Sequence, residues 1–187
     1  MKRLTLALIP LLLLCGCAPV AREPDNLALV RVLGVDGSGP VILTAVCGGT
    51  DGKEIRRGTA TGADFLTARR QLPWSGEGAE LSLTGVSYLL VGPEADLQAM
   101  LFAVLEDADL GAAATVWLAE DGAAKLLDAG TDPVADLELL ALQGVCAPTV
   151  AQAVAALSTE GTVSLPCLVE RGGHLEEWGM MEWRADK

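Results

Sequence analysis

The sequence predicts an α/β (α+β) fold in which a mixed β-sheet packs against several helices within a single domain. Apolar runs of strand length alternate along the chain with segments whose apolar residues recur at helical spacing. The 187 residues are enough for one domain with a substantial core once a short leader is set aside. Apolar residues make up 51% of the chain and aromatic residues only 4%, so Leu, Val and Ala must form most of that core.

Residues 1–16 have the pattern of a lipoprotein signal peptide. Two basic residues precede an apolar segment, residues 4–14, which is too short to cross a hydrocarbon core about 30 Å thick and is typical of a secretory leader. Gly16 is the small residue that lipoprotein processing requires immediately before the modified cysteine. We therefore expect lipid attachment at Cys17, where a diacylglycerol and an N-acyl chain together give stable anchoring.

Residues 17–26 are polar, contain two prolines and are expected to form a lipidated tether. The alternative is an ordinary secretory leader cleaved after Ala18 or Ala21. Removal of Lys2 and Arg3 with the leader leaves 11 of the 13 basic side chains against 25 acidic ones, a net charge of −14. That charge argues against nucleic acid as a partner and against electrostatic binding to anionic lipid, so the lipid chains have to hold the protein at the membrane.

The domain, residues 27–187, is predicted to begin with a β-hairpin. Residues 27–35 are apolar on both alternating faces, which is typical of a strand buried on both sides. Residues 36–39, "DGSG", have the composition of a turn, and residues 40–47 are the predicted return strand. The polar segment 48–58 is expected to form a loop or a pair of polar strands.

The middle of the domain is predicted to contain a helix, a strand and a second helix. Residues 61–72 have a helical pattern, with Thr61 as a candidate N-cap. Residues 80–92 are strand-like, and Pro93 suits the first turn of the next helix. The apolar side of this next helix is expected to consist of Leu97, Leu101, Val104 and Leu105.

The last part of the domain is predicted to contain a strand, three short helices and a second hairpin. The strand covers residues 113–119. The three helices are expected over residues 122–129, 134–143 and 149–157. The hairpin joins "TVSLPCLVE" and "LEEWGMMEW" through a turn at "RGG".

The start of the domain, "PDNLALVRVLGVDGSG", resembles the opening of the Ger(x)C spore germination lipoproteins, the C subunits of nutrient germinant receptors. Further similar segments follow in the same order as in that family. They are "GTATGADFLTARRQL", the long stretch from "LTGVSYLLVG" to "DGAAKLL", "PTVAQAVAALSTEGTVSLPCLV" and "LEEWGMMEWRADK". The family's "RD-P" segment corresponds here to Glu106, Asp107 and Ala108, and the resemblance covers only the N-terminal domain of the longer family members.

The resemblance implies a non-enzymatic lipoprotein of the spore inner membrane, on its extracytoplasmic face. It implies association with the integral membrane A and B subunits of a germinant receptor, and a role in nutrient-triggered germination. Two alternatives belong to other classes. One is an extracytoplasmic ligand-binding or scaffolding lipoprotein unrelated to germination, and the other is a secreted hydrolase, which the absence of catalytic motifs disfavours.

The motifs that would indicate catalysis or a metal site are weak in this sequence. His174 is the one histidine and is expected to lie solvated in a hairpin turn. Residues 85–89 fail the nucleophile-elbow pattern because Leu89 occupies the position of its second glycine. "DADLG", residues 107–111, is similar to the start of a calcium loop but lacks the later ligands, so a solvated helix end is expected. We predict no cofactor and no metal.

The cysteines and tryptophans of the domain leave alternatives open. Cys47, Cys146 and Cys167 are either three buried free thiols or one disulfide with a free thiol. Trp74 and Trp178 are expected in packing roles, with a ligand pocket as the alternative. The last predicted strand also has an apolar strip, formed by Trp178, Met180, Met181 and Trp183. This strip either contacts a partner, as a second copy or a membrane subunit, or folds back into the core of the domain.

Overall fold

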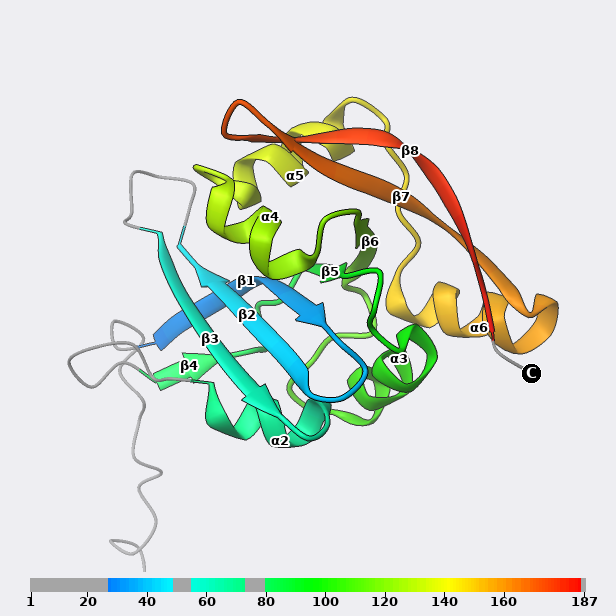
Figure 1. The fold of residues 1–187 in the computed structure, drawn as a ribbon, viewed down its shortest axis with the longest axis horizontal. Coiled ribbons are helices and arrows are strands. Elements are labelled where there is room, and N and C mark those ends of the chain that lie inside the picture. Colours follow the sequence, from blue (N-terminus) through cyan, green and yellow to red (C-terminus); the bar gives the residue numbers. More distant parts are fainter. Residues whose placement is uncertain (1–26, 49–54, 73–79, 186–187) are drawn as a thin grey trace, which may run out of the picture.

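The computed structural model describes residues 27–48, 55–72 and 80–185, which form one α/β domain with a mixed sheet (Figure 1). The predicted signal peptide and tether therefore lie outside the described residues. The elements follow in the order β1 (Leu27–Asp36), β2 (Val41–Cys47), β3 (Arg56–Gly62), α2 (Phe65–Gln71), β4 (Glu80–Ser82), β5 (Tyr88–Val91), α3 (Leu97–Glu106), β6 (Thr115–Ala119), α4 (Ala123–Ala129), α5 (Pro133–Leu142), α6 (Val150–Glu160), β7 (Thr162–Arg171) and β8 (His174–Arg184).

The sheet has the strand order β3-β2-β1-β5-β6-β7-β8, and the short strand β4 also pairs with β1. The central strands β1, β5, β6 and β7 run parallel to one another. An antiparallel hairpin flanks them on each side, with β2 and β3 beyond β1, and β8 beyond β7. The predicted mixed sheet and both predicted hairpins are therefore confirmed, with β8 at one edge of the sheet and β3, beyond the first hairpin, at the other.

Helices cover both faces of the sheet, so the domain has three layers. One buried cluster joins the sheet to α2, α3 and α6, and a second cluster joins the opposite face to α4 and α5. In Figure 1, α4 lies next to β1 and β2, above them in this view, and α3 and α6 lie close together near the base of the β7–β8 hairpin. Strand β1 contributes to both clusters because its side chains alternate between the two faces, and an irregularity in the strand between Val30 and Val32 places these two residues on opposite faces.

The predicted burial of β1 on both faces is confirmed. Val30 and Leu33 face the larger cluster and Val32 faces the smaller one, and each of these side chains is fully buried. The return strand β2 pairs with β1 as predicted. The polar segment that follows contains β3, and the part of this segment at residues 49–54 lies outside the described residues.

The predicted single strand over residues 80–92 is wrong in one respect, because it is interrupted. Strands β4 and β5 both pair parallel with β1, β4 with its first half and β5 with its second half. A turn at Thr84 and Gly85 separates them. Leu29 pairs with Ser82 on β4, and Val32 pairs with Tyr88 on β5. The step from Leu29 to Val32 is three residues and the step from Ser82 to Tyr88 is six, so the turn contains the three additional residues.

The helix predicted from Thr61 begins later, at Phe65. Thr61 and Gly62 belong to β3, and Asp64 is the N-cap, accepting a hydrogen bond from Thr67 N at 2.7 Å. Gly62 has a structural reason to be a glycine, since an added Cβ would lie 2.2 Å from Ala68 N. The first residues of the predicted helix therefore belong to β3, which ends at Gly62 in close contact with α2.

Helix α3 begins four residues later than predicted. Pro93 lies in a turn after β5, and Asp96 caps the helix by accepting from Ala99 N at 2.9 Å. Three of the four predicted apolar positions are buried, but Leu105 is exposed and Met100 is buried in its place. Leu97, Met100, Leu101 and Val104 recur at spacings of three and four residues and form the buried face, and Leu105 lies beyond the edge of that face.

The three remaining helices and the second hairpin are confirmed within a few residues. Helix α6 has a full capping box, in which Thr149 and Gln152 bond to each other's backbone N–H groups. Strands β7 and β8 pair along their whole length, with one irregularity beside Cys167 and Leu168. The hairpin tip contacts α5, so β8 has helical cover near its start.

Candidate functional site

Two of the sequence-predicted residues cannot be placed. Cys17 and Trp74 lie outside the described residues. Lipid attachment at Cys17 therefore stays a prediction. Within the described ranges, no helix has both the length and the apolar character needed to cross a membrane.

The predicted apolar strip lies on β8, at one end of the sheet. Trp178 is 60% exposed, Met180 55% and Met181 45%. Trp183 differs, because it is half-buried and packs against the larger core cluster. Three of the four side chains are thus at the surface, and one belongs to the core of the domain.

The backbone of β8 explains how its apolar side chains are presented. Gly179 pairs with Cys167 and Glu177 pairs with Leu168, so Trp178 is the extra residue of a β-bulge. After the bulge, Met180 and Met181 point to opposite faces of the sheet because they are consecutive in a strand. We call Trp178, Met180 and Met181 the β8 edge.

Charged residues surround the β8 edge. Glu176, Glu177 and Glu182 are exposed on the same strand. Arg171 lies over the ring of Trp178, with its guanidinium carbon 4.7 Å from the ring centroid. This distance is within the range of a cation–π contact, which restricts the orientation of the exposed ring.

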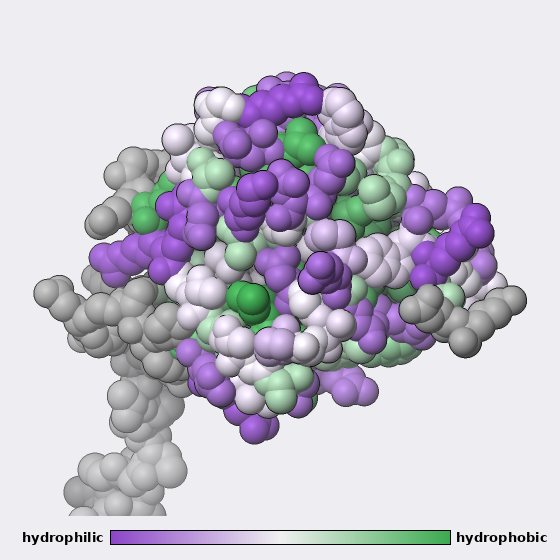
Figure 2. All heavy atoms as spheres, viewed as in Figure 1, coloured by the Kyte–Doolittle hydropathy of each residue, from purple (hydrophilic) through white to green (hydrophobic). Residues whose placement is uncertain are grey.

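The surface seen in Figure 2 lacks a broad apolar face. Hydrophobic residues appear there as separate patches among hydrophilic ones. Single exposed apolar residues are normal on a soluble domain. The β8 edge differs from such scattered residues because its three large side chains lie within four consecutive positions.

His174 is exposed, as predicted, but it is also anchored. Its side chain is 66% exposed, and Nδ1 lies 3.0 Å from Oδ1 of the buried Asp136. The other carboxylate oxygen accepts a hydrogen bond from Leu175 N at 2.9 Å. Asp136 is the only side chain bonded to His174 in the described part of the chain. The pair therefore holds the hairpin tip on α5. No Ser, Cys or Thr side chain among the described residues is hydrogen-bonded to His174 as a nucleophile would be.

The segment similar to a calcium loop is part of an ion-pair cluster. Asp107 is buried, which corrects the expectation of a solvated helix end. Arg69 Nε lies 2.8 Å from Asp107 Oδ2, and the same guanidinium also contacts Asp109. Both carboxylates therefore already pair with the guanidinium of Arg69. Across residues 27–48, 55–72 and 80–185, no group of three or more His, Cys, Asp or Glu residues is arranged to hold a metal ion.

The three cysteines of the domain are free. Cys47 and Cys167 are buried and Cys146 is exposed, so neither alternative from the sequence is fully correct. Burial raises the pKa of Cys47 to about 11, against a smaller lowering by Arg56. Burial also raises the pKa of Cys167. Both buried thiols are therefore protonated and unreactive at neutral pH.

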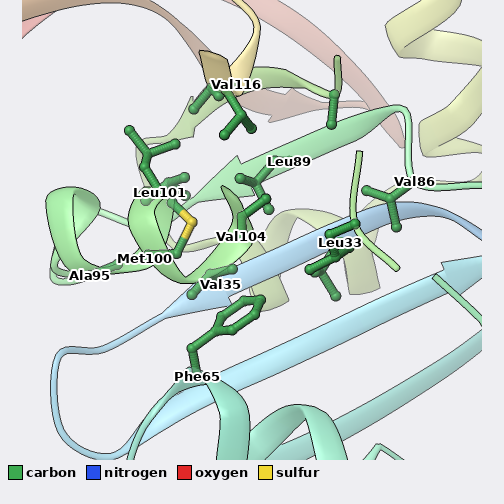
Figure 3. Packing of buried hydrophobic residues seen from close by; sticks show 14 of the residues in the cluster. Leu33, Val35, Phe65, Val86, Leu89, Ala95, Met100, Leu101, Val104 and Val116 are labelled. Atoms are coloured by element: carbon green, nitrogen blue, oxygen red, sulfur yellow. The ribbon is translucent and has the colours of Figure 1, made fainter. Parts of the chain in front are cut away.

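A pocket of about 330 Å³, which the sequence analysis did not predict, lies at the carboxyl end of β1. Its floor consists of side chains from three elements, and Figure 3 shows Phe65 of α2 and Met100 of α3 pointing toward Val35 of β1. In parallel sheets, ligands bind at the carboxyl ends of strands where the connections diverge. Here the chain leaves β1 toward β2 and leaves β5 toward β6, on opposite sides.

The sequence contains only a weak signal for this pocket. Ala95, Ala99 and Ala103 recur every four residues and place small side chains along one side of the segment that contains α3. Nothing local in the sequence brings this row to the end of β1 or to the start of α2. The pocket also has two carboxylates among its lining residues, Asp64 and Asp96.

Comparison of the chain with protein-family models, with curated proteins and with solved structures finds no match.

Proposed function

We propose that this protein is a membrane-anchored lipoprotein similar to the C subunit of a nutrient germinant receptor, which acts in spore germination by binding partner proteins and not as an enzyme. The observation that carries the proposal is the β8 edge, where three large apolar side chains are exposed on the last strand of the sheet. Strands at the end of a sheet can pair with another chain, and Trp and Met are enriched in interface cores.

The order of the family-like segments also supports the proposal. "LALVRVLGVD" is β1, "FLTARRQ" is α2 and "YLLV" is β5. Later segments contain α6 with most of β7, and then most of β8. The segments that resemble the Ger(x)C family therefore contain β1, α2, β5, α3, β6 and α6 in full and parts of β3, α4, β7 and β8.

The proposed location is the extracytoplasmic face of a membrane, the spore inner membrane by resemblance, with Cys17 as the lipidated residue. The proposed partners are the integral membrane A and B subunits. We expect a Cys17→Ala variant to move from the membrane fraction to the soluble fraction and to lose fatty-acid labelling. A Cys17→Ala protein that remained membrane-bound and labelled would contradict the anchor.

The β8 edge is tested by replacing its three side chains together. We expect Trp178→Ser, Met180→Ser and Met181→Ser in one chain to reduce co-purification with the A and B subunits about tenfold or more, as is typical when exposed hot-spot residues are removed. Nutrient-triggered germination should slow in the same strain. The fold should persist, because the three side chains are largely exposed.

A matched control exists on α5. Leu139 and Leu142 are also exposed apolar residues, on another surface. Leu139→Ser with Leu142→Ser should leave co-purification and germination unchanged. Equal effects of the two sets of variants, or no effect of the β8 set, would contradict a partner site at β8.

The second candidate function is an extracytoplasmic ligand-binding lipoprotein unrelated to germination. The observation that favours it is the pocket between α2 and α3. Deletion of the gene, followed by germination assays over a panel of nutrients, separates the two candidates. A germination defect supports the receptor-subunit proposal, and normal germination in every nutrient supports the second candidate.

A further inference from the structure

The pocket between α2 and α3 has an apolar floor. Val35, Phe65, Ala95 and Met100 are all buried and all line the pocket. Figure 3 places these four side chains around one region between β1, α2 and the start of α3. A ligand that entered here would contact apolar carbon and sulfur atoms over its inner end.

Small side chains account for the empty volume. Ala63 precedes α2, and Ala99 and Ala103 line the pocket from α3. Protein interiors are close-packed, and voids much larger than a water molecule are few. A pocket of about 330 Å³ lies near the lower end of the sizes that hold small-molecule ligands.

The charge of the lining is negative. Asp64 and Asp96 are the charged residues among the lining side chains, and none of the lining residues is basic. Each uses Oδ1 to cap its helix. An ionised carboxylate has about four acceptor positions, so both retain capacity for a further donor. The Thr67 backbone N–H lowers the pKa of Asp64, with a smaller contribution from Arg70.

We infer that this pocket binds a small molecule with an apolar body and one primary ammonium group. The apolar body lies on the floor formed by Val35, Phe65 and Met100, and the ammonium lies between the carboxylates of Asp64 and Asp96. Carboxylates favour a cation and repel an anion at the same position, so the lining selects amines over acids of equal shape. The inference depends neither on the β8 edge nor on the lipid anchor.

The test uses three probes of one shape and different charge. They are cyclohexylmethylamine, cyclohexylmethanol and cyclohexanecarboxylate, titrated into the full-length chain in zwitterionic nanodiscs, with empty nanodiscs as the blank. Binding is followed by the methyl resonances of isotope-labelled methionine. Met100 lines the pocket, whereas Met180 and Met181 lie on β8 and serve as internal controls. We expect the amine to shift Met100 at low millimolar concentration, the alcohol to bind about fivefold more weakly, the carboxylate to bind more weakly still, and Met180 and Met181 to stay unchanged with all three probes.

The carboxylates are tested without removing the helix caps. Asn is as good an N-cap as Asp, so Asp64→Asn with Asp96→Asn keeps both helices while removing both charges. Exposed ion pairs are weak, so we expect affinity for the amine to fall about fivefold and affinity for the alcohol to stay the same. Asp132→Asn is the matched control, because Asp132 caps α5 and does not line the pocket.

The cavity is tested by filling it. Ala99→Phe places a ring in the pocket and should abolish the amine-dependent shift of Met100. Gln98→Phe adds the same ring one residue earlier on α3, at an exposed position that does not line the pocket, and should bind as the original chain does. Circular dichroism of every variant confirms that the fold is kept.

Each result decides the inference. Selective binding of the amine, weakened by the double Asn variant and lost in Ala99→Phe, supports it. Equal binding of the three probes, no binding of the amine up to ten times the expected concentration, or unchanged binding in a folded Ala99→Phe protein would overturn it. Germination and co-purification of the β8 variants are measured separately, so failure of the proposed function and failure of this inference are distinguishable.

Discussion

Two charged side chains attach one short helix to the sheet from opposite ends. Helix α4 has seven residues and no side-chain cap of its own at Gly122. Asp36, at the end of β1, accepts from Ala123 N and from Ala124 N, each at 2.7 Å. Arg57, on β3, donates to the carbonyls of Leu127 and Gly130 at the other end. A negative charge at the amino end and a positive charge at the carboxyl end both complement the helix dipole.

Gly92 allows Asp36 to take this position. An added Cβ at Gly92 would lie 2.0 Å from Asp36 Oδ1. A side chain there would push the carboxylate away from α4. The sequence suggested only a turn at residues 36–39, because the partners of Asp36 lie more than 80 residues further along the chain. A contact of this sequence separation leaves no local pattern to recognise.

We expect Asp36→Ala to lower the free energy of unfolding by about 2 kcal/mol, because two charge-assisted hydrogen bonds are lost and two N–H groups at a partly buried helix end lose their partner. Urea unfolding followed by circular dichroism measures the change. Asp121→Ala is the control, since Asp121 forms only an exposed ion pair with Lys125 and should cost less than about 0.5 kcal/mol. Equal losses in the two variants would contradict the cap.

At the scale of whole elements, the sequence predicted best those elements whose pattern is both periodic and locally bounded. The burial of β1, the helix at residues 149–157 and the hairpin of β7 with β8 follow from apolar runs, helical spacing and turn glycines. These signals are local, and the tertiary structure agrees with them.

The wrong boundaries lie where two local signals compete. Thr61 and Asp64 are both good N-cap residues. Thr61 pairs with Ile42 in the sheet and so cannot begin the helix, which leaves Asp64 as the N-cap. Pro93 suits both a first helical turn and a simple turn, and the structure uses the second. Tertiary pairing therefore overrides propensity at these positions.

The candidate sites differ in how much of each was visible in the sequence. The apolar strip on the last strand was recognised because its residues are neighbours on one strand, but the sequence left open whether the strip is exposed or folded back into the core. The partial burial of Trp183 was not predictable from the sequence, because it comes from contact with the larger core cluster and not from the position of Trp183 in the strand. The pocket was missed because its lining comes from the end of β1, the start of α2 and one side of α3. Such a site exists only after these distant segments pack together.

For the molecule as a whole, the larger buried cluster joins both ends of the sheet. It includes Ala60 on the edge strand β3 and Cys47 on β2, and at the other end it includes Cys167 on β7 and contacts Trp183 on the edge strand β8. The smaller cluster, on the opposite face, also extends from Val46 on β2 to Leu168 on β7. Because each face has one continuous core, neither end of the sheet has a core of its own. This arrangement favours a single cooperative unfolding transition.

Alkylation of the three cysteines can test whether the domain unfolds in one transition, because the three thiols lie in different parts of the structure. Cys146 is exposed and should react with iodoacetamide at once, whereas Cys47 and Cys167 should react only after the protein opens. Burial raises the pKa of both buried thiols, so the stability that this burial contributes is complete below the unfolded value near 9.0 and falls as the pH rises toward about 11. Labelling at pH 8 therefore avoids the window in which ionisation itself destabilises the fold.

At pH 8, we expect Cys47 and Cys167 to be labelled with the same opening free energy and the same dependence on urea, because one global transition exposes both ends of the sheet. Mass spectrometry of the peptides separates the two sites, and Cys146 gives the rate of an unprotected thiol. The competing possibility is local opening of the β7–β8 hairpin, since β6 pairs with β7 through only two residue pairs. Faster labelling of Cys167, with a weaker urea dependence than that of Cys47, would show that the hairpin opens alone and that the domain is not one cooperative unit.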